Sequence, residues 1–388
     1  MEKTIGWFVP GLLKGSGGHR TIFKHAEFLE KSGYKCKMFI ESQAPFSNVV
    51  DSRLTQRVGE YYGCSNLEIY EGFPDNYKLD LAFATVWYTA RKVHSLSPMT
   101  KKAYFVQDYE PFFYPVGDIY LHARMSYRFG LVPITIGRWL SYKLQREQQQ
   151  TPRYFDFCAD QKVYRPLMDM ERENAVCAIF QPDKPRRCSE IVRETLGLLK
   201  QKYPEVSIYT YGSDCMPGFS FPHTHLGIIS VEECNKLYNR CRAGLCISST
   251  NPSRLPFEMM AAGLPVVDVC DENTIFDFPD VGMVLANGDP ASLAAALEIL
   301  LLDPEQHSVH REGGMRFMND RPFEEEYLQF KQHVDELFLT EKSRFEVPEP
   351  LYRRDPIIAD LNSYGQFDSV SRGPSRLKRL LKRIREKI

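Results

Sequence analysis

The sequence predicts an α/β protein made of two doubly wound, Rossmann-like domains that face each other across a cleft, followed by a C-terminal amphipathic helix. Short apolar runs alternate with helical patterns over most of the chain, which is typical of parallel sheets covered on both faces. This alternation runs twice, with a break near residues 158–174. The length of 388 residues also exceeds what one ordinary core accommodates.

The composition indicates a globular chain of the cytoplasm. Hydrophobic residues make up 43% and charged residues 26% of the sequence, and no apolar run is long enough to span a bilayer. Met1–Pro10 lacks the basic flank and cleavage site of a signal peptide, so none is expected. Ten irregularly spaced cysteines without a CxxC pair are typical of free thiols in a reducing compartment and predict no metal site.

The first domain is expected over residues 1–165. Ile22, Ala26 and Leu29 fall on one face of its first helix, which Gly33 ends. The runs expected to form its strands are Thr4–Val9, Cys36–Ile40, Leu79–Thr85, Ala103–Gln107 and Val132–Ile136.

The second domain is expected over residues 170–322. Ile191, Leu198 and Leu199 share one face of a helix there. Its expected strands are Ala175–Phe180, Val206–Tyr211, Ala243–Ile247 and Leu264–Val269. Because doubly wound folds bind ligands at the carboxyl ends of their strands, two such domains predict a site in the cleft between them.

The C-terminal part divides into a linker and a basic helix. Residues 341–374 lose periodicity and contain four prolines, so we expect a linker. In residues 375–388, apolar side chains follow helical spacing among basic ones, and the last 18 residues hold eight Lys or Arg and one Glu. Such a helix lies flat on an anionic membrane, gaining roughly 1 kcal/mol per basic residue. We therefore expect Arg376–Ile388 to contact a membrane. A helix that binds a protein partner is the second interpretation, and no nucleic-acid partner is expected.

A glycine-rich turn, Gly11–Arg20, follows the first expected strand and precedes the first helix. Glycines allow close backbone approach, and a helix N-terminus attracts anions. Gly17, Gly18 and His19 are therefore candidates for phosphate or acceptor binding. A plain tight turn is the alternative, and NAD binding ranks lower because Arg20 stands where a third glycine is needed.

The segment Gln107–Pro115 combines acids with aromatic residues at the end of an expected strand. Carboxylates accept hydrogen bonds from sugar hydroxyls, and aromatic rings stack on the apolar faces of sugars. Asp108 and Glu110 are the candidate catalytic bases, and Gln107 and Tyr109 the candidate acceptor contacts. A solvated loop whose aromatic residues fill a gap between the domains is the alternative.

Two further segments predict a site for a nucleoside diphosphate. Arg186 and Arg187 follow the first strand of the second domain, where guanidinium groups suit phosphate oxygens, although a solvated basic turn has the same sequence. In Ser248–Val267, a polar loop leads into a short apolar helix whose Glu258 is placed to accept from ribose hydroxyls. The remaining candidate donor contacts are Gly212, Ser249, Thr250, Ser253, Arg254 and Leu255.

The segment Phe257–Val267 resembles the donor-site motif of the GT4 family of retaining glycosyltransferases, which have the GT-B fold. By this resemblance Glu258 matches the second glutamate of the motif, which holds the donor ribose. Thr250 stands where the first glutamate belongs, which fits a donor that lacks a hydroxyl or a subgroup with a different grip on the sugar.

Asp80–Ala90, Tyr104–Pro111 and the turn Gln181–Arg187 resemble the WsaF-like and rhamnan-synthesis rhamnosyltransferases of bacterial surface polysaccharides. This resemblance implies a retaining transfer without metal or cofactor, from dTDP-L-rhamnose or another nucleotide sugar to a growing or lipid-linked glycan. It also implies that residues 323–340 cross back to the first domain and that the enzyme is peripheral at the inner face of the cell membrane. A nucleotide-sugar epimerase on the same fold and a catalytically inert nucleotide-sugar-binding protein are the alternatives.

Overall fold

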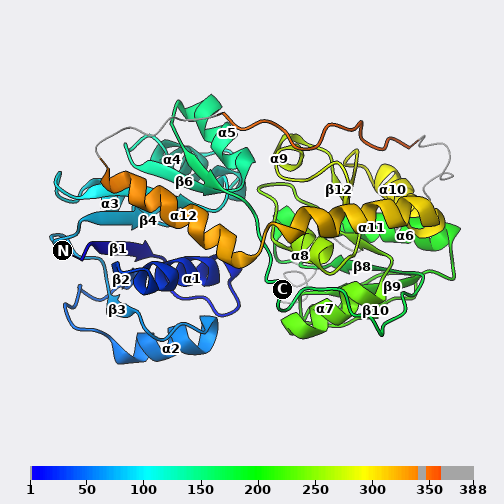
Figure 1. The fold of residues 1–388 in the computed structure, drawn as a ribbon, viewed down its shortest axis with the longest axis horizontal. Helices are drawn as coiled ribbons and strands as arrows, with labels where there is room; N and C mark the ends of the chain where they lie inside the picture. The colour runs from blue at the N-terminus through cyan, green and yellow to red at the C-terminus, as the bar shows by residue number, and fades with distance from the viewer. Residues whose placement is uncertain (1, 340–346, 360–388) are drawn as a thin grey trace, which may run out of the picture.

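A computed structural model describes residues 2–339 and 347–359 of the chain and contains two parallel sheets, one in each domain (Figure 1). The seven-stranded first sheet has the order β3-β2-β1-β4-β5-β6-β7. Its strands are β1 (Thr4–Val9), β2 (Lys35–Ile40), β3 (Glu68–Glu71), β4 (Leu81–Ala84), β5 (Lys101–Val106), β6 (Val132–Ile136) and β7 (Arg153–Phe155). Its connections contain α1 (Gly17–Lys31), α2 (Ser52–Tyr62), α3 (Trp87–His94), the short helix η1 (Glu110–Phe113), α4 (Asp118–Ser126) and α5 (Arg138–Gln148).

The six-stranded second sheet has the order β10-β9-β8-β11-β12-β13. Its strands are β8 (Ala175–Ile179), β9 (Ser207–Tyr211), β10 (Thr224–His225), β11 (Ala243–Leu245), β12 (Val266–Val269) and β13 (Met283–Ala286). Its connections contain η2 (Pro185–Arg187), α6 (Ser189–Lys202), α7 (Val231–Arg240), α8 (Leu255–Ala261) and α9 (Glu272–Ile275), and α10 (Pro290–Leu302), α11 (Pro304–Asn319) and α12 (Phe323–Phe338) follow. The prediction of two doubly wound domains is confirmed.

The central strands are buried on both faces, which explains their continuous apolar sequences. Every residue of β4 and of β8 is buried. In the first domain Trp7 stacks on Phe83 with ring centroids 4.4 Å apart, and Phe105 completes the cluster. Alternation of apolar and polar residues is therefore absent, as expected for sheets covered by helices on both sides.

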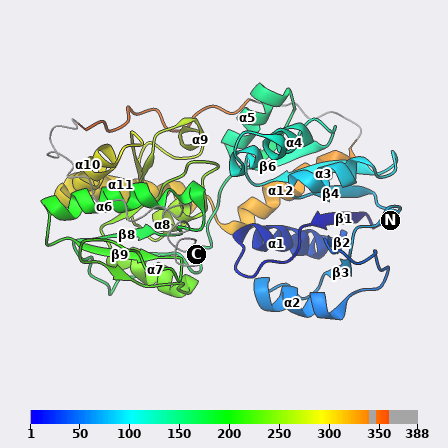
Figure 2. The same cartoon turned by 180° about the vertical axis from the view of Figure 1, so that it is seen from behind.

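Helix α12 follows the second domain in sequence but packs on the first sheet. Figure 1 shows it in front of this sheet, on the same side as α1, and it contacts α1 and β7. Figure 2 shows the opposite side of the sheet, with α12 behind it. Phe330 of α12 lies 5.3 Å from Phe105 and 5.6 Å from Phe155, measured between ring centroids. Burial of these aromatic rings ties α12 to the first domain.

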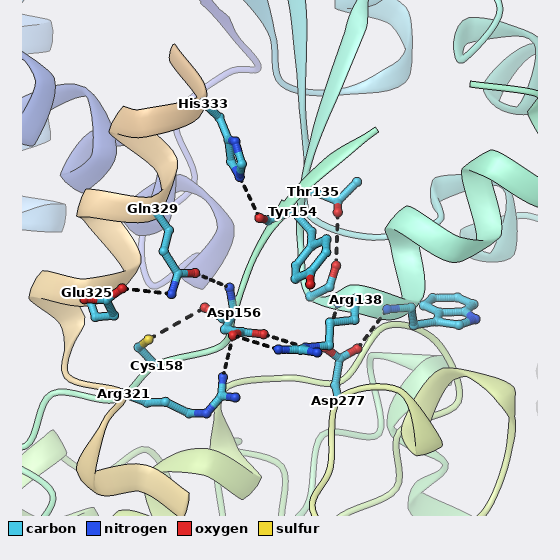
Figure 3. A network of polar contacts seen from close by, with 12 residues as sticks. Thr135, Arg138, Tyr154, Asp156, Cys158, Asp277, Arg321, Glu325, Gln329 and His333 are labelled. Atoms are coloured by element: carbon cyan, nitrogen blue, oxygen red, sulfur yellow. Dashed lines mark hydrogen bonds and ion pairs between the residues drawn. The ribbon is translucent and has the colours of Figure 1, made fainter. Parts of the chain in front are cut away.

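A polar network marks the junction through which the chain passes between the domains (Figure 3). Asp156, just after β7, accepts two hydrogen bonds from Arg138 at 2.9 and 3.2 Å and pairs with Arg321 at 3.0 Å. Asp277 of the second domain accepts from the backbone N–H groups of Arg138 and Trp139, at 2.7 and 3.2 Å. Asp277 thereby caps the N-terminus of α5 from the opposite domain.

The described part of the expected linker is ordered along the second sheet. Ile357 donates its N–H to Leu285 and accepts from Asn287, each at 2.9 Å, so it forms a bridge with the open edge of β13. Tyr352 is buried against the same domain. The expected helix 375–388 lies outside the described residues. Among the helices of residues 2–339 and 347–359, none is both long and apolar enough to cross a bilayer.

Candidate active site

A cleft of about 950 Å³ opens between the carboxyl ends of the two sheets. Both domains line it, through the start of α1, the loop after β5, the turn after β8, the loop between β11 and α8, and the start of α12. Of the residues expected at the site, those that line this cleft are Gly17, Gly18, His19, Gln107, Asp108, Glu110, Arg186, Arg187, Ser249, Thr250, Ser253, Arg254, Leu255 and Glu258.

The glycine-rich turn lies at the N-terminus of α1. Ser16 caps this helix by accepting from the N–H of His19, and its hydroxyl also lies 2.9 Å from Nδ1 of the His19 ring. Burial lowers the pKa of His19, which favours the neutral imidazole. Gly18 faces the side chain of Gln107, and a β-carbon there would lie 3.5 Å from its amide. The turn and the loop after β5 therefore form one continuous wall of the cleft.

Asp108 joins the first domain to the second. One oxygen of its carboxylate accepts from the backbone N–H groups of Tyr109 at 2.8 Å and Asn251 at 3.0 Å. The other oxygen accepts from the Thr250 hydroxyl at 3.0 Å. The Asn251 side chain adds donated bonds to the carbonyl oxygens of Gln107 at 3.0 Å and Ile136 at 3.1 Å. This Asp108 clamp engages both carboxylate oxygens and positions the second-domain loop.

Glu110 is the other acid of this loop and is 6% exposed. Its carboxylate accepts from the N–H of Trp87 at 2.9 Å and from the Tyr104 hydroxyl at 2.7 Å. Burial raises the pKa of Glu110 to about 7, which is suitable for proton transfer near neutral pH.

Tyr109, which was expected to contact the acceptor, does not line the cleft. Its ring stacks on Tyr127 with centroids 5.6 Å apart, and its hydroxyl donates to Glu147 at 3.1 Å. The ring is 1% exposed because the chain turns at η1 and directs it into the first domain. The sequence pattern alone does not reveal this direction.

The turn after β8 concentrates positive charge at the cleft. Burial lowers the pKa of Lys184, and repulsion from Arg187 and Arg186 adds to this effect. Burial and the neighbouring Arg186 likewise lower the pKa of Arg187. The Arg186 guanidinium lies over the ring of Phe113 at 4.9 Å from its centroid. Three crowded cations at one turn form a site that an anion stabilises.

The two segments expected to bind the diphosphate lie side by side. The Ser249 hydroxyl donates to the Arg186 carbonyl at 2.9 Å. The start of the Ser248–Glu258 loop is held by buried Asp268 of β12. Ser248 donates its N–H and its hydroxyl to the Asp268 carboxylate at 2.8 and 2.7 Å. The Ser253 hydroxyl lines the cleft and has no hydrogen-bond partner among the described residues.

Gly212 lies behind this wall and outside the cleft lining. Its carbonyl accepts from the side-chain amide of Gln181 at 2.9 Å, and its φ of +98° is the left-handed conformation that glycine adopts readily. Gln181 itself lines the cleft. Gly212 therefore supports a neighbour of the expected site and makes no direct contribution to the cleft.

The Arg254 side chain is held by another residue and not left open for phosphate. Its guanidinium pairs with both carboxylate oxygens of Glu326 on α12 and donates to the Cys158 carbonyl at 3.2 Å. His25 of α1 lies on the other side of Glu326, with its Nε2 3.4 Å from the carboxylate. Burial lowers the pKa of His25 to about 4, so this ring is neutral at pH 7. Arg254 and Glu326 thus tie α8 to α12.

Glu258 lies one turn into α8 and faces the cleft. Burial raises its pKa to about 7, while the charge of Arg254 and a hydrogen bond from Tyr164 act in the opposite direction. Tyr164 and Arg20 line the same part of the cleft and were missed by sequence analysis. Neither residue has a local signal, since Tyr164 comes from the connection between the domains and Arg20 from the exposed side of α1.

Residues 2–339 and 347–359 contain no group of three or more His, Cys, Asp or Glu side chains that could hold a metal ion.

Known proteins resemble this chain both in sequence and in fold. Residues 174–298 match the family described as "WsaF, C-terminal domain". The O-antigen biosynthesis protein RfbC of Myxococcus xanthus is 29% identical over 277 residues, which are 68% of this chain and 22% of RfbC. The chain therefore spans about a fifth of the length of that relative.

Two solved structures share the arrangement of both domains. HepE of Anabaena, in complex with UDP and glucose, has a TM-score of 0.64 and 13% identity, covering 86% of this chain and 99% of HepE. A mutant of S. aureus TarM, in complex with ligands that include UDP, has a TM-score of 0.66 and 8% identity, covering 87% of this chain and 100% of TarM. At these identities the structural likeness establishes the fold.

The chain has the GT-B fold, and residues 174–298 of its second domain match the WsaF C-terminal domain. The WsaF domain contains the turn with Arg186 and the loop that ends at Glu258, and so it forms the more basic wall of the cleft. Helix α12 lies beyond the matched range and completes the first domain.

Proposed function

We propose that the chain transfers a sugar from a nucleoside diphosphate to a glycan acceptor of surface-polysaccharide biosynthesis. One observation carries this proposal: the Arg186 turn and the Ser248–Glu258 loop are joined by a hydrogen bond of 2.9 Å and line the same interdomain cleft. A diphosphate is the ligand that suits several cations beside an unpaired hydroxyl group. The biosynthetic role is supported by the likeness to RfbC.

In this proposal the diphosphate of the donor binds at the turn after β8. Lys184, Arg186 and Arg187 neutralise its charge, and the Ser253 hydroxyl donates to a phosphate oxygen. Because charge builds up on the diphosphate as the sugar leaves, preorganised cations stabilise the transition state more than the bound donor. Glu258 accepts hydrogen bonds from the ribose hydroxyls.

The acceptor binds on the first-domain side, between the start of α1 and the loop after β5. Glu110 lines that side and has a pKa of about 7, so it is the candidate base for the attacking hydroxyl. Asp108 has a different role from Glu110, because its carboxylate bonds to Thr250 and Asn251 of the second domain, whereas the Glu110 carboxylate bonds within the first domain. A rhamnose-like sugar and retention of configuration are the finer parts of the proposal, and they rest on the resemblance to rhamnosyltransferases.

The donor is tested by a thermal-shift screen of nucleoside diphosphates and their sugars, including dTDP-L-rhamnose and UDP-glucose. We expect one base and one sugar to raise the melting temperature most. Arg186→Ala should weaken binding by about 1.5–3 kcal/mol, the cost of a lost hydrogen bond to a charged group. Arg240→Ala is the matched control, since Arg240 pairs with Glu173 outside the cleft. Equal affinity in both variants would refute the assignment.

The reaction is tested by incubating the preferred donor with and without glycan acceptors. A transferase releases nucleoside diphosphate and extends the acceptor only when both substrates are present. NMR of the donor alone in D₂O detects an epimerase, because the sugar then exchanges a proton without transfer. Binding without any turnover, across acceptors of both free and lipid-linked type, would contradict a transferase.

A further inference from the structure

The segment from η1 to the end of α4 carries an unusual amount of exposed apolar surface. Twenty large hydrophobic side chains are exposed in the described part of the chain, and six of them fall between residues 112 and 125 of this segment. They are Phe112, Phe113, Val116, Ile119, Leu121 and Met125, with exposed fractions between 40% and 86%. Apolar side chains exposed singly are common, whereas a cluster marks an interaction surface.

The outward face of α4 combines apolar and basic residues. Ala123 and Ser126 are buried where α4 packs against α3 and η1. Leu121 and Met125 lie one turn apart on the opposite face, and Arg124 lies between them. Arg128 follows just after the helix, is exposed, and donates one hydrogen bond through its Nε to Gln148 of α5 at 2.9 Å. Asp118 is the sole acidic residue between 112 and 128, so the surface has a net positive charge.

This surface is continuous with the mouth of the cleft. Phe113 and Tyr114 line the cleft, and Phe113 is covered on one face by Arg186 of the second domain. Helix α4 begins four residues after Tyr114 and packs against η1, so the apolar residues extend from the cleft outward over the first domain. Figures 1 and 2 place α4 above the first sheet, next to α5.

We propose that the η1–α4 surface, residues 112–128, docks on an anionic lipid bilayer. Apolar side chains enter the interface between headgroups and acyl chains, and the flanking arginines pair with anionic headgroups, which is the pattern of helices that lie on membranes. The positive charges of Arg124 and Arg128 are complementary to the negative charge of such a membrane. The role of this docking rests on the proposed function. A docked enzyme would open its cleft next to the membrane surface, where the sugar of a lipid-linked acceptor lies.

The docking is tested with full-length protein and vesicles of phosphatidylcholine, with and without phosphatidylglycerol. We expect Leu121→Ser/Met125→Ser to reduce partitioning onto the anionic vesicles by about tenfold, since each change removes several CH₂ equivalents from the apolar interface. Leu302→Ser/Val309→Ser is the matched control, because these side chains are comparably exposed on α10 and α11 of the second domain. The C-terminal basic segment is present in all of these proteins and contributes equally.

A second readout follows insertion directly. Val116 is 86% exposed, so Val116→Trp should fold normally and shift its fluorescence to the blue on anionic vesicles. Equal partitioning of the Leu121/Met125 variant and the control, or no fluorescence shift at position 116, would overturn the proposal. Loss of a concentration-dependent dimer in the same variant, seen by light scattering, would assign the surface to a second copy of the chain and equally overturn it.

Donor binding distinguishes this failure from a failure of the proposed function. The Leu121/Met125 variant leaves the Arg186 turn intact, so its thermal shift with the donor should match the wild type. Absence of donor binding in the wild type would refute the transferase and leave vesicle partitioning unaffected. Normal donor binding with unchanged partitioning would refute the docking surface alone.

Discussion

The contact between Asp108 and Thr250 should contribute measurably to holding the two domains together. The Asp108 carboxylate accepts from the Thr250 hydroxyl at 3.0 Å and from the Asn251 N–H at 3.0 Å, and all three groups are buried or half-buried. Thr250→Val removes one donor and keeps the shape of the side chain. Asp108→Ala removes the acceptor for three donors, including the N–H of Tyr109.

The magnitude follows from the number of groups left without a partner. A hydrogen bond to a buried acceptor contributes about 1 kcal/mol, and each buried donor that loses its acceptor costs about 1–3 kcal/mol. We therefore expect Thr250→Val to lower the free energy of unfolding by about 1 kcal/mol and Asp108→Ala by about 3 kcal/mol. The double variant should lose less than the sum, with a coupling free energy of about 1 kcal/mol.

The assay is urea unfolding of the wild type, both single variants and the double variant. Asp289 and Ser292 provide a control within one domain, because the Ser292 hydroxyl donates to Asp289 at 2.7 Å at the start of α10. Asp289→Ala should destabilise the second domain without changing small-angle scattering of the native protein. Asp108→Ala should in addition raise the radius of gyration. A coupling free energy indistinguishable from zero between Asp108 and Thr250 would refute the clamp.

Three other changes test the site and the junction. The pKa of Glu258 is about 7, so calorimetry should find that nucleoside diphosphate affinity rises with pH through 7 as the carboxylate ionises, and that Glu258→Gln abolishes this dependence. Burial raises the pKa of Asp277 from 3.8 to about 7, so the folded protein binds the carboxyl proton more tightly than the unfolded chain does. The free energy of unfolding therefore falls as pH rises from about 4 to about 7. Asp277→Asn should reduce this dependence of the unfolding free energy on pH, measured by urea titrations at several pH values. Gly137→Ala should lose at least about 2 kcal/mol in the same assay, because φ is +87° and the new β-carbon would lie 2.6 Å from Phe157. An unchanged free energy of unfolding in the Gly137→Ala variant would contradict this prediction and show that the turn adjusts to the added β-carbon.

The fold was predictable because the central strands are long and continuously apolar. Thr4–Val9 and Val132–Ile136 were expected with their observed bounds, since both are buried in parallel sheets. Strands β3, β7, β10 and β13 were missed because each contains only two to four residues, too few for a periodic signal. The sequence also did not indicate that β13 is an edge strand, so the pairing of Ile357 with it was not expected.

The site was predictable only where its chemistry is local in sequence. The arginine turn and the Ser248–Glu258 loop each follow a strand, and parallel strands bring such segments to one edge. The partners of individual side chains were not predictable. Arg254 pairs with Glu326, which lies 72 residues away, and Asp108 bonds to Thr250, which lies 142 residues away. Such pairs depend on the packing of the domains and leave no pattern in either segment.

The residue at position 250 connects donor chemistry to domain arrangement. The motif that this loop resembles has a glutamate here, and a second carboxylate beside buried Asp108 would repel it, because two neighbouring buried acids cannot both ionise at low cost. Threonine avoids this repulsion and donates to Asp108 instead. A threonine at position 250 can form this interdomain hydrogen bond only because Asp108 lies on the opposite wall of the cleft. Positions 108 and 250 are therefore best understood as one unit. Under the proposed function, other groups of the cleft then hold the donor sugar, and Ser253 and the exposed Arg20 both line this cleft.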